Sequence, residues 1–282
     1  MKFLWSGGSS LGGRRYNEDR VLMLHSREAV LLAVADGMGG HLHGELASQM
    51  VIDTLSHLFA LAARPRLADP ARFLQDALHE VQHALVRLAL SRRFPEVPST
   101  TVVAALVQDE KLYCAWAGDS RLYLLEHGAV SWRTQDHSTV QRLLDRGLIS
   151  EDEALVHPER NRIYSCLGGT DSPLIGQAGP LSLSAGSTLL LCSDGVWSQM
   201  REHELVRALS ARALTQVVPA LLQVAERRGG ASSDNLSVAA MTLLPASRSG
   251  AGVVDSQDAP EIPDAMMAAL ESEMMASGRS LL

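Results

Sequence analysis

The sequence has little of what marks disulfide-stapled, zinc-ribbon or nucleic-acid-coating proteins. Its three cysteines, Cys114, Cys166 and Cys192, lie far apart and form no CxxC pair, which argues against a disulfide framework or a zinc ribbon. Lysine is nearly absent, since Lys2 and Lys111 are the only two, and no long basic run occurs. With a net charge of −7, the chain lacks the clustered positive surface typical of proteins that coat nucleic acids.

Long apolar runs are also missing. The longest, such as 29–35 and 102–107, are too short to span a bilayer, and the apolar start at 1–5 is too short for a signal peptide. Yet 46% of the residues are hydrophobic and 20% are charged, a balance that favours a folded chain over a disordered one. We therefore expect a cytoplasmic protein without a membrane segment.

The apolar pattern predicts strands joined by hairpins in the middle of the chain, with helices at its flanks. The expected strands are 21–24, 29–35, 101–108, 111–116, 122–126, 188–192 and 236–243. The expected helices are 44–62, 70–90, 138–146 and 215–227. This arrangement favours an α+β layered fold with antiparallel sheets over a parallel Rossmann-type sheet.

The composition changes after Pro245, where we place a domain boundary. Residues 1–245 are expected to form one compact domain, and residues 246–254 a flexible Ser/Gly-rich linker. Within the remaining tail, the Met-rich segment 263–276 has the pattern of a short amphipathic helix. We therefore expect 246–282 to lie outside the compact domain.

Acidic residues stand next to several of the expected strands. They are Glu18 and Asp19 before 21–24, Asp36 after 29–35, Asp119 between 111–116 and 122–126, Asp194 after 188–192, and Asp234 before 236–243. One such residue is an ordinary turn residue, but several at strand ends would repel one another unless a cation lay between them. Oxygen ligands without cysteine or a histidine cluster suit a hard cation such as Mg²⁺ or Mn²⁺.

Two arginines, Arg14 and Arg15, precede the acidic pair Glu18 and Asp19. A guanidinium beside metal-binding acids suits the binding of a phosphoryl group, because it can hold two of the non-bridging oxygens. The alternative is that these are ordinary surface arginines. The residues alone do not show whether Arg14 or Arg15 would be the phosphate-binding one.

Five motifs occur in the order RRYNED, ADGMGG, AGDSR, SDGVW and SDNLS. In this order they resemble the PPM family, the metal-dependent Ser/Thr protein phosphatases also called protein phosphatase 2C-like, and the DGMGG form resembles its bacterial branch. The resemblance covers about residues 6–244. It implies a four-layer α-β-β-α sandwich of two antiparallel sheets flanked by helices, with a metal centre at one end.

The resemblance also implies two Mn²⁺ or Mg²⁺ ions. Asp36 would bridge both ions, and the Gly37 carbonyl would bind one of them. Asp194 and Asp234 would complete the coordination of the other ion. Ions about 4 Å apart lower the pKa of a shared water, which gives the hydroxide that attacks phosphorus.

The other motif residues have expected roles by the same resemblance. Glu18 and Asp19 match acids that act mainly through metal-bound water. Arg14 matches the phosphate-binding arginine, whereas Arg15 is out of register. Asp119 matches the acid of a third metal site, which we expect to be weaker and more exposed. Arg14, Asp19 and Asp36 are the residues expected to take part directly in catalysis.

One position departs from the family pattern. Some members carry a histidine directly after the Asp-Gly pair, where it is thought to protonate the leaving group, but here the residue is Met38. His41 and His43 lie nearby, and a metal-bound water is the alternative donor. A flap region at about 134–169 is expected to influence substrate choice.

The expected activity is hydrolysis of phosphoserine and phosphothreonine in proteins, reversing a Ser/Thr kinase in bacterial signalling. The expected partners are therefore phosphorylated substrates of a cognate kinase, and the chain is expected to be a monomer. One alternative is a catalytically inactive PPM-like scaffold, although no metal acid is lost. Another is a partner-switching phosphatase for one dedicated regulatory phosphoprotein, although such enzymes tend to lack the RxxNED form.

Overall fold

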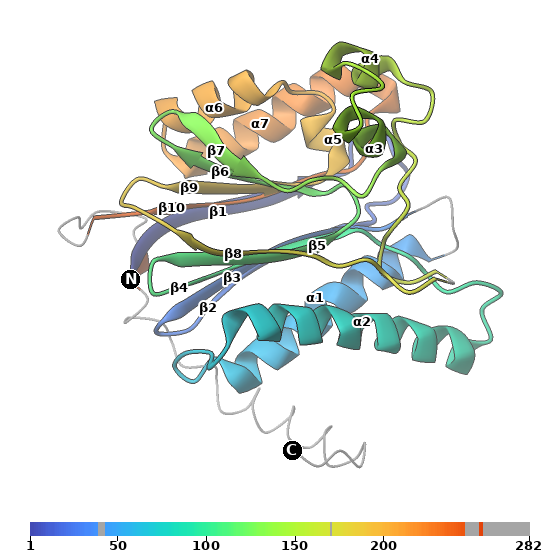
Figure 1. Ribbon diagram of the computed structural model, residues 1–282, viewed down its shortest axis with the longest axis horizontal. Coiled ribbons are helices and arrows are strands. Elements are labelled where there is room, and N and C mark those ends of the chain that lie inside the picture. Colours follow the sequence, from blue (N-terminus) through green and yellow to red (C-terminus); the bar gives the residue numbers. More distant parts are fainter. Residues whose placement is uncertain (39–42, 170, 246–253, 256–282) are drawn as a thin grey trace.

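The computed structural model describes residues 1–38, 43–169, 171–245 and 254–255. Two antiparallel sheets pack face to face, with helices α1 and α2 outside one sheet and α6 and α7 outside the other (Figure 1). The architecture is the predicted four-layer α-β-β-α sandwich. No described helix is both long enough and apolar enough to cross a membrane.

The five-stranded sheet has the order β2-β3-β4-β5-β8. Its strands are β2 (Asp19–His25), β3 (Ala29–Asp36), β4 (Val102–Gln108), β5 (Lys111–Ala117) and β8 (Gly176–Ser182). The helices α1 (Gly44–Ala62) and α2 (Pro70–Arg92) cover its outer face. Since helices cover one face and the second sheet covers the other, β3 and β4 are apolar along nearly their whole length.

The six-stranded sheet has the order β11-β1-β10-β9-β6-β7. Its strands are β1 (Lys2–Ser10), β6 (Arg121–Glu126), β7 (Ala129–Arg133), β9 (Thr188–Cys192), β10 (Leu236–Leu243) and β11 (Val254–Asp255). The helices α5 (Asp194–Trp197), α6 (Glu202–Ala211) and α7 (Leu214–Gly229) lie on its outer side. Two short helices, α3 (Thr139–Asp145) and α4 (Glu151–Val156), lie beside α5 at one end of the sandwich (Figure 1).

Aliphatic side chains fill the space between the two sheets. Leu32 and Val103 from the five-stranded sheet pack with Leu191, Ala239 and other residues of the six-stranded sheet, and all of these are fully buried. Each sheet also packs against its own helices through one further apolar cluster. The acidic strand ends are therefore attached to a close-packed core that holds them in place.

The predicted strands and helices are all present, with ends shifted by a few residues at most. The strands β1, β7 and β8 and the helices α4, α5 and α6 were not predicted. β1 contains Gly7 and Gly8, which weaken a strand pattern; a side chain at Gly7 would collide with Met23 of the facing sheet. β8 contains Pro180, which has no N–H to donate. β8 can hold this residue because it is an edge strand, one side of which pairs with no other strand of the sheet.

The predicted linker and tail helix lie almost wholly outside the described residues. One difference is visible: Val254 and Asp255, expected in the linker and tail, pair with Phe3 and Lys2 as β11. The outer edge of β1 offers unpaired backbone groups, and an extended segment can add to it. The boundary at Pro245 stays a prediction.

We expect a chain that ends at Pro245 to unfold cooperatively, with a Tm within about 4 °C of the full chain. β11 adds only two residue pairs, and about 1 kcal/mol corresponds to roughly 2–4 °C for a domain of this size. Differential scanning calorimetry measures the difference. A chain ending at Asp258 keeps β11 and is the matched control. Loss of the cooperative transition in the shorter chain would show that the compact domain extends beyond Pro245.

Candidate metal centre

The acidic residues gather at one end of the sandwich, and both sheets contribute to them. Asp19 begins β2 and Asp36 ends β3, and the two residues lie directly opposite each other in the strand register. From the other sheet, Asp194 follows β9 and Asp234 precedes β10. Asp119 lies in the turn between β5 and β6. The strand-end acids of the sequence are therefore brought together by the face-to-face packing of the sheets.

The carboxyl groups of Asp36 and Asp194 interact across the two sheets. Each group alters the pKa of the other, so the two are stable together only if one is protonated or a cation lies between them. Burial, followed by the charges of Asp19 and Asp194, raises the pKa of Asp36 well above its usual value. Burial and the neighbouring Asp234 raise the pKa of Asp194 to about 6.

Asp19 is the most buried of the β2 and β3 acids, with 2% of its surface exposed. Its Oδ2 accepts a hydrogen bond of 2.7 Å from the Ser193 hydroxyl, whereas its Oδ1 has no partner among the described residues. Burial raises its pKa to about 7, although the bond from Ser193 opposes that rise. An unpartnered buried oxygen next to other acids is what a cation or an ordered water would satisfy.

The backbone around Gly37 is fixed by its neighbours. The N–H of Thr101 and the hydroxyl of Thr100 both donate to the Asp36 carbonyl at 2.8 Å, while the Gly37 N–H donates to the Glu18 carbonyl at 3.1 Å. A side chain at Gly37 would collide with the Gly44 backbone at the start of α1. The Gly37 carbonyl accepts no hydrogen bond from the described residues, so it is free to act as the predicted ligand.

Asn235 organises the loop that carries Glu18, and sequence reasoning gave it no role. Its Oδ1 accepts from the Glu18 N–H at 2.9 Å, and its Nδ2 donates to the carbonyls of Leu11 and Tyr16 at 2.9 and 3.0 Å. The only signal in the sequence is its place beside Asp234 in the SDNLS motif. Burial, and then the charge of Glu45, raise the pKa of Glu18.

Arg14, rather than Arg15, reaches the acid cluster. Its Nη2 lies 2.6 Å from Oδ2 of Asp234, and the two side chains are 55% and 38% exposed. The loop can approach so closely because Gly12 has a φ of +60° and packs on the Asp234 backbone, where any side chain would collide with the carbonyl. Arg15 is exposed.

Asp119 is held by Trp197 and Arg121, two motif residues to which the sequence analysis gave no role. The Trp197 indole N–H donates to its carbonyl at 2.9 Å. Arg121 lies 3.6 Å above the Trp197 ring and pairs with Asp136 at 2.7 Å. The expectation of a more exposed site was wrong, because Asp119 is only 5% exposed. The tight β5–β6 turn and the Trp197 side chain cover it, and burial raises its pKa.

Two of the residues near the expected proton-donor position, Met38 and His43, lie in the described part of the chain. Met38 follows Gly37 as the sequence requires, and its N–H donates to the Ser99 carbonyl at 3.0 Å. His43 precedes α1 and stacks on Phe94, with ring centroids 4.3 Å apart. His41 lies outside the described residues.

The donor set fits a hard divalent cation. It consists of carboxylates and one free carbonyl, and Asp19, Asp36 and Asp194 have no arginine or lysine partner among the described residues. In that same part of the chain, no three His, Cys, Asp or Glu side chains stand at the spacing of a finished metal site. Closing the site on an ion therefore needs side-chain adjustment or water ligands, which Mg²⁺ retains readily.

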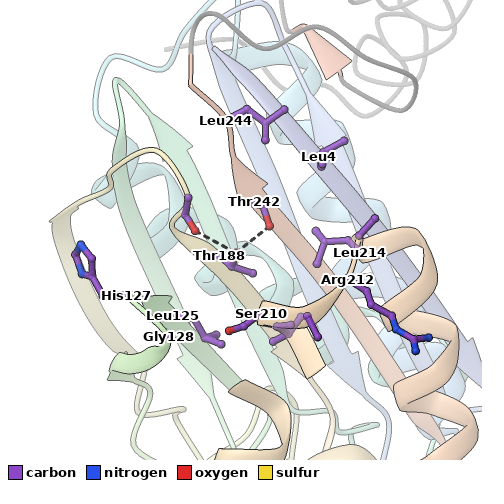
Figure 2. A pocket seen from close by; sticks show the side chains of 14 residues that line it. Leu4, Leu125, His127, Gly128, Thr188, Ser210, Arg212, Leu214, Thr242 and Leu244 are labelled. Carbon is purple, nitrogen blue, oxygen red and sulfur yellow. Dashed lines mark hydrogen bonds between the residues drawn. The ribbon is translucent and has the colours of Figure 1, made fainter. Parts of the chain in front are cut away.

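A separate cavity of about 460 Å³ lies at the opposite end of the six-stranded sheet (Figure 2). The hydroxyls of Thr188 and Thr242, 2.8 Å apart, are among the groups that line it. Arg212 and His127 are among its lining residues, and none of the described residues that line it carries a carboxylate. It is therefore unrelated to the acid cluster.

Comparison with known proteins gives a consistent result. A family model described as protein phosphatase 2C matches residues 7–239. The serine/threonine phosphatase stp of Listeria innocua is 33% identical over 228 residues, covering 80% of this chain and 89% of that protein. The serine/threonine protein phosphatase PstP of Mycobacterium tuberculosis is 35% identical over 226 residues, covering 80% of this chain and 42% of that protein.

Solved structures agree with the sequence matches. The crystal structure of the M. tuberculosis phosphatase PstP/Ppp gives a TM-score of 0.76 at 33% identity, covering 87% of this chain and all of that one. A catalytic domain of PstP in complex with two manganese ions gives a TM-score of 0.74 at 31% identity, covering 86% and 99% of the two chains.

The raised pKa values predict that the metal-free chain loses stability as pH rises. Asp19 and Asp194 have folded-state pKa values of about 7 and 6, above the usual 3.8, so their contribution is fully present below about pH 4 and is lost as pH rises through 6 to 7. In a chelator, we expect the Tm to fall by several degrees between pH 5 and pH 8, and to fall less in Asp19→Asn. The control is Asp76→Asn, an exposed residue on α2. Equal slopes in wild type and Asp19→Asn would contradict the assignment.

Proposed function

Because the chain belongs to the protein phosphatase 2C family, also called the PPM family, we propose that its acid cluster is the metal centre of a phosphatase active site. The protein is a metal-dependent serine/threonine phosphatase that acts in bacterial signalling. Asp36, Asp194, Asp234 and the Gly37 carbonyl are the proposed ligands of two divalent ions. The observation that carries this proposal is the convergence of the Asp36 and Asp194 carboxyls, which come from different sheets, interact with each other, and have no arginine or lysine partner among the described residues.

The residues around the ions have distinct proposed roles. Two divalent ions supply the positive charge that activates a water for attack on phosphorus. Arg14 binds two non-bridging oxygens of the phosphoryl group with its planar fork. Glu18 and Asp19 bind and orient water in the same site. The free Oδ1 of Asp19, which points away from its Ser193 bond, is the atom available for this.

A cysteine nucleophile, the alternative phosphatase chemistry, is disfavoured by the surroundings of the thiols. Cys192 lies two residues before Asp194 but is fully buried, and burial raises its pKa to about 12. Burial also raises the pKa of Cys114 to about 12 and that of Cys166 above its usual value. Because the thiolate is the reactive form, these residues are poor nucleophiles near neutral pH.

We propose Mn²⁺ or Mg²⁺ as the ions, since the donors are all oxygen atoms and a related catalytic domain was solved with two manganese ions. Asp119 is the proposed ligand of a third, weaker site. Burial and the charges of Asp194 and Asp136 raise its pKa, and a bound cation would offset that repulsion. The buried pair of Arg121 and Asp136 beside it has no net charge to compete with an ion.

The proposed substrates are phosphoproteins made by a cognate Ser/Thr kinase, in line with the names of the relatives. We also propose that the chain works as a monomer in the cytoplasm. Its three cysteines form no disulfide bond in the described fold, which suits a reducing compartment. An inactive scaffold is disfavoured because none of the expected metal acids is replaced in the sequence.

Replacing a metal acid should abolish turnover while the fold survives. With Mn²⁺ and p-nitrophenyl phosphate, we expect Asp194→Asn and Asp234→Asn to lose at least two orders of magnitude in kcat. Each change removes a proposed ligand of the ions whose charge activates water. Asp119→Asn should lose less at saturating Mn²⁺. Steady-state kinetics and circular dichroism test this together. Wild-type turnover in Asp194→Asn, or full activity of the wild type in excess chelator, would remove the metal assignment.

The two arginines give a second test of the site. We expect Arg14→Ala to lower kcat/KM for a phosphothreonine peptide roughly a hundredfold through lost charge stabilisation. Arg14→Lys should recover only part, because lysine lacks the planar fork. Arg15→Ala is the matched control and should stay near wild type. The reverse pattern in the two alanine variants would place the phosphate-binding residue one position later.

A further inference from the structure

A buried hydrogen bond links the two sheets directly beneath the acid cluster. The Ser193 hydroxyl, at the end of β9, donates to Oδ2 of Asp19, at the start of β2, over 2.7 Å. Ser193 is fully buried and Asp19 is 2% exposed. The two residues belong to different sheets and stand 174 positions apart in the chain. This bond therefore fixes an acid of one sheet against the backbone of the other.

The direction of the Ser193 hydroxyl is set by its second partner. The Ser237 N–H donates to Ser193 Oγ at 3.0 Å, and the Ser193 N–H donates to the Ser237 carbonyl at 3.1 Å. With a lone pair of the oxygen occupied by this N–H, the hydroxyl proton is directed at the Asp19 carboxylate. A bond donated to a carboxylate is stronger than one between neutral groups.

The bond belongs to a closed set of contacts that we call the hydroxyl ring, formed by Ser9, Asn17, Asp19, Ser193 and Ser237. The Ser237 hydroxyl contacts Ser9 Oγ at 2.8 Å, and Asn17 Nδ2 donates to the same oxygen at 2.7 Å. The ring closes where the Asp19 N–H donates to Asn17 Oδ1 at 3.0 Å. It joins β1, β2, β10 and the end of β9, next to Asp194, which follows β9, and Asp234, which precedes β10.

We propose that Ser193 is a positioning residue that holds Asp19, and with it the acid-bearing ends of both sheets, at the spacing that the metal ions require. This inference rests on the proposed metal centre. Asp19 and Asp36 lie opposite each other in register and repel each other when both are charged. The Ser193 bond holds Asp19 by Oδ2 and leaves Oδ1 for the ion or its water, so the geometry exists before the metal arrives.

Ser233 provides a matched control within the same chain. Like Ser193, it directly precedes a proposed metal ligand, in this case Asp234, and it is 2% exposed. Its hydroxyl, however, donates to the carbonyl of Asp234 at 3.2 Å and does not cross to the other sheet. Removing each hydroxyl therefore separates cross-sheet positioning from the general effect of a buried serine beside a ligand.

The experiment is a titration of the metal-free full-length protein with Mn²⁺ by isothermal calorimetry. We expect Ser193→Ala to weaken Mn²⁺ binding about 10–100-fold, the range found when a group that orients a metal ligand is removed. Ser233→Ala should stay within about twofold of wild type. Ser193→Cys keeps the size of the side chain with a weaker donor and should also weaken binding, which keeps the test valid if the alanine variant folds poorly.

Kinetics with p-nitrophenyl phosphate provide a second readout. In Ser193→Ala, the Mn²⁺ concentration for half-maximal activity should rise in parallel with the calorimetric Kd, while kcat at saturating Mn²⁺ falls by less than about tenfold. Equal Mn²⁺ affinity in Ser193→Ala, Ser193→Cys and Ser233→Ala would overturn the positioning role, as would a loss of kcat without a change in affinity. Failure of the wild type itself to bind Mn²⁺ would overturn the proposed metal centre, and this inference with it.

Discussion

The burial of several mutually repelling carboxylates at one end of the sandwich is the constraint on which the rest of the site depends. Asp19, Asp36, Asp119 and Asp194 all have raised pKa values, and in each case burial is the largest cause. Such a cluster costs stability in a metal-free chain, and only a well-packed fold tolerates it. The apolar layer between the sheets supplies that rigidity, because acids such as Asp36 and Asp194 lie at the ends of buried strands.

The division of the acids between two sheets explains why the site is built from long-range contacts. Neither sheet alone carries enough ligands, and the spacing between its acids and those of the other sheet follows from how the sheets pack. Hydrogen bonds near the acids set this spacing locally: Asn235 ties the β1–β2 loop to the start of β10, and Ser193 ties β9 to β2. These neutral groups bring negative charges together without contributing charge of their own.

The acidic residues were predictable because each follows or precedes an apolar strand, a signal that is local in sequence. Asp36 after 29–35 and Asp194 after 188–192 are clear examples. The groups that hold them were not predictable, since Ser193 and Asp19 are paired only after the sheets have packed. β8 escaped prediction for a related reason: with Gly176 and Pro180, its edge position is visible only in the assembled sheet. Local chemistry predicts the ligands, and tertiary packing decides their partners.

The placement of Arg14 connects metal binding with phosphate binding. The loop of Gly12 and Gly13 packs directly on the backbone around Asp234, so the same segment that approaches the proposed ligand also carries the guanidinium. In the described fold that guanidinium pairs with Asp234 at 2.6 Å. An ion bound by Asp234 would draw on the same carboxylate charge and weaken its hold on Arg14. The arginine would then be more available to phosphate when the metal is in place, which would couple the two binding events through a single carboxylate.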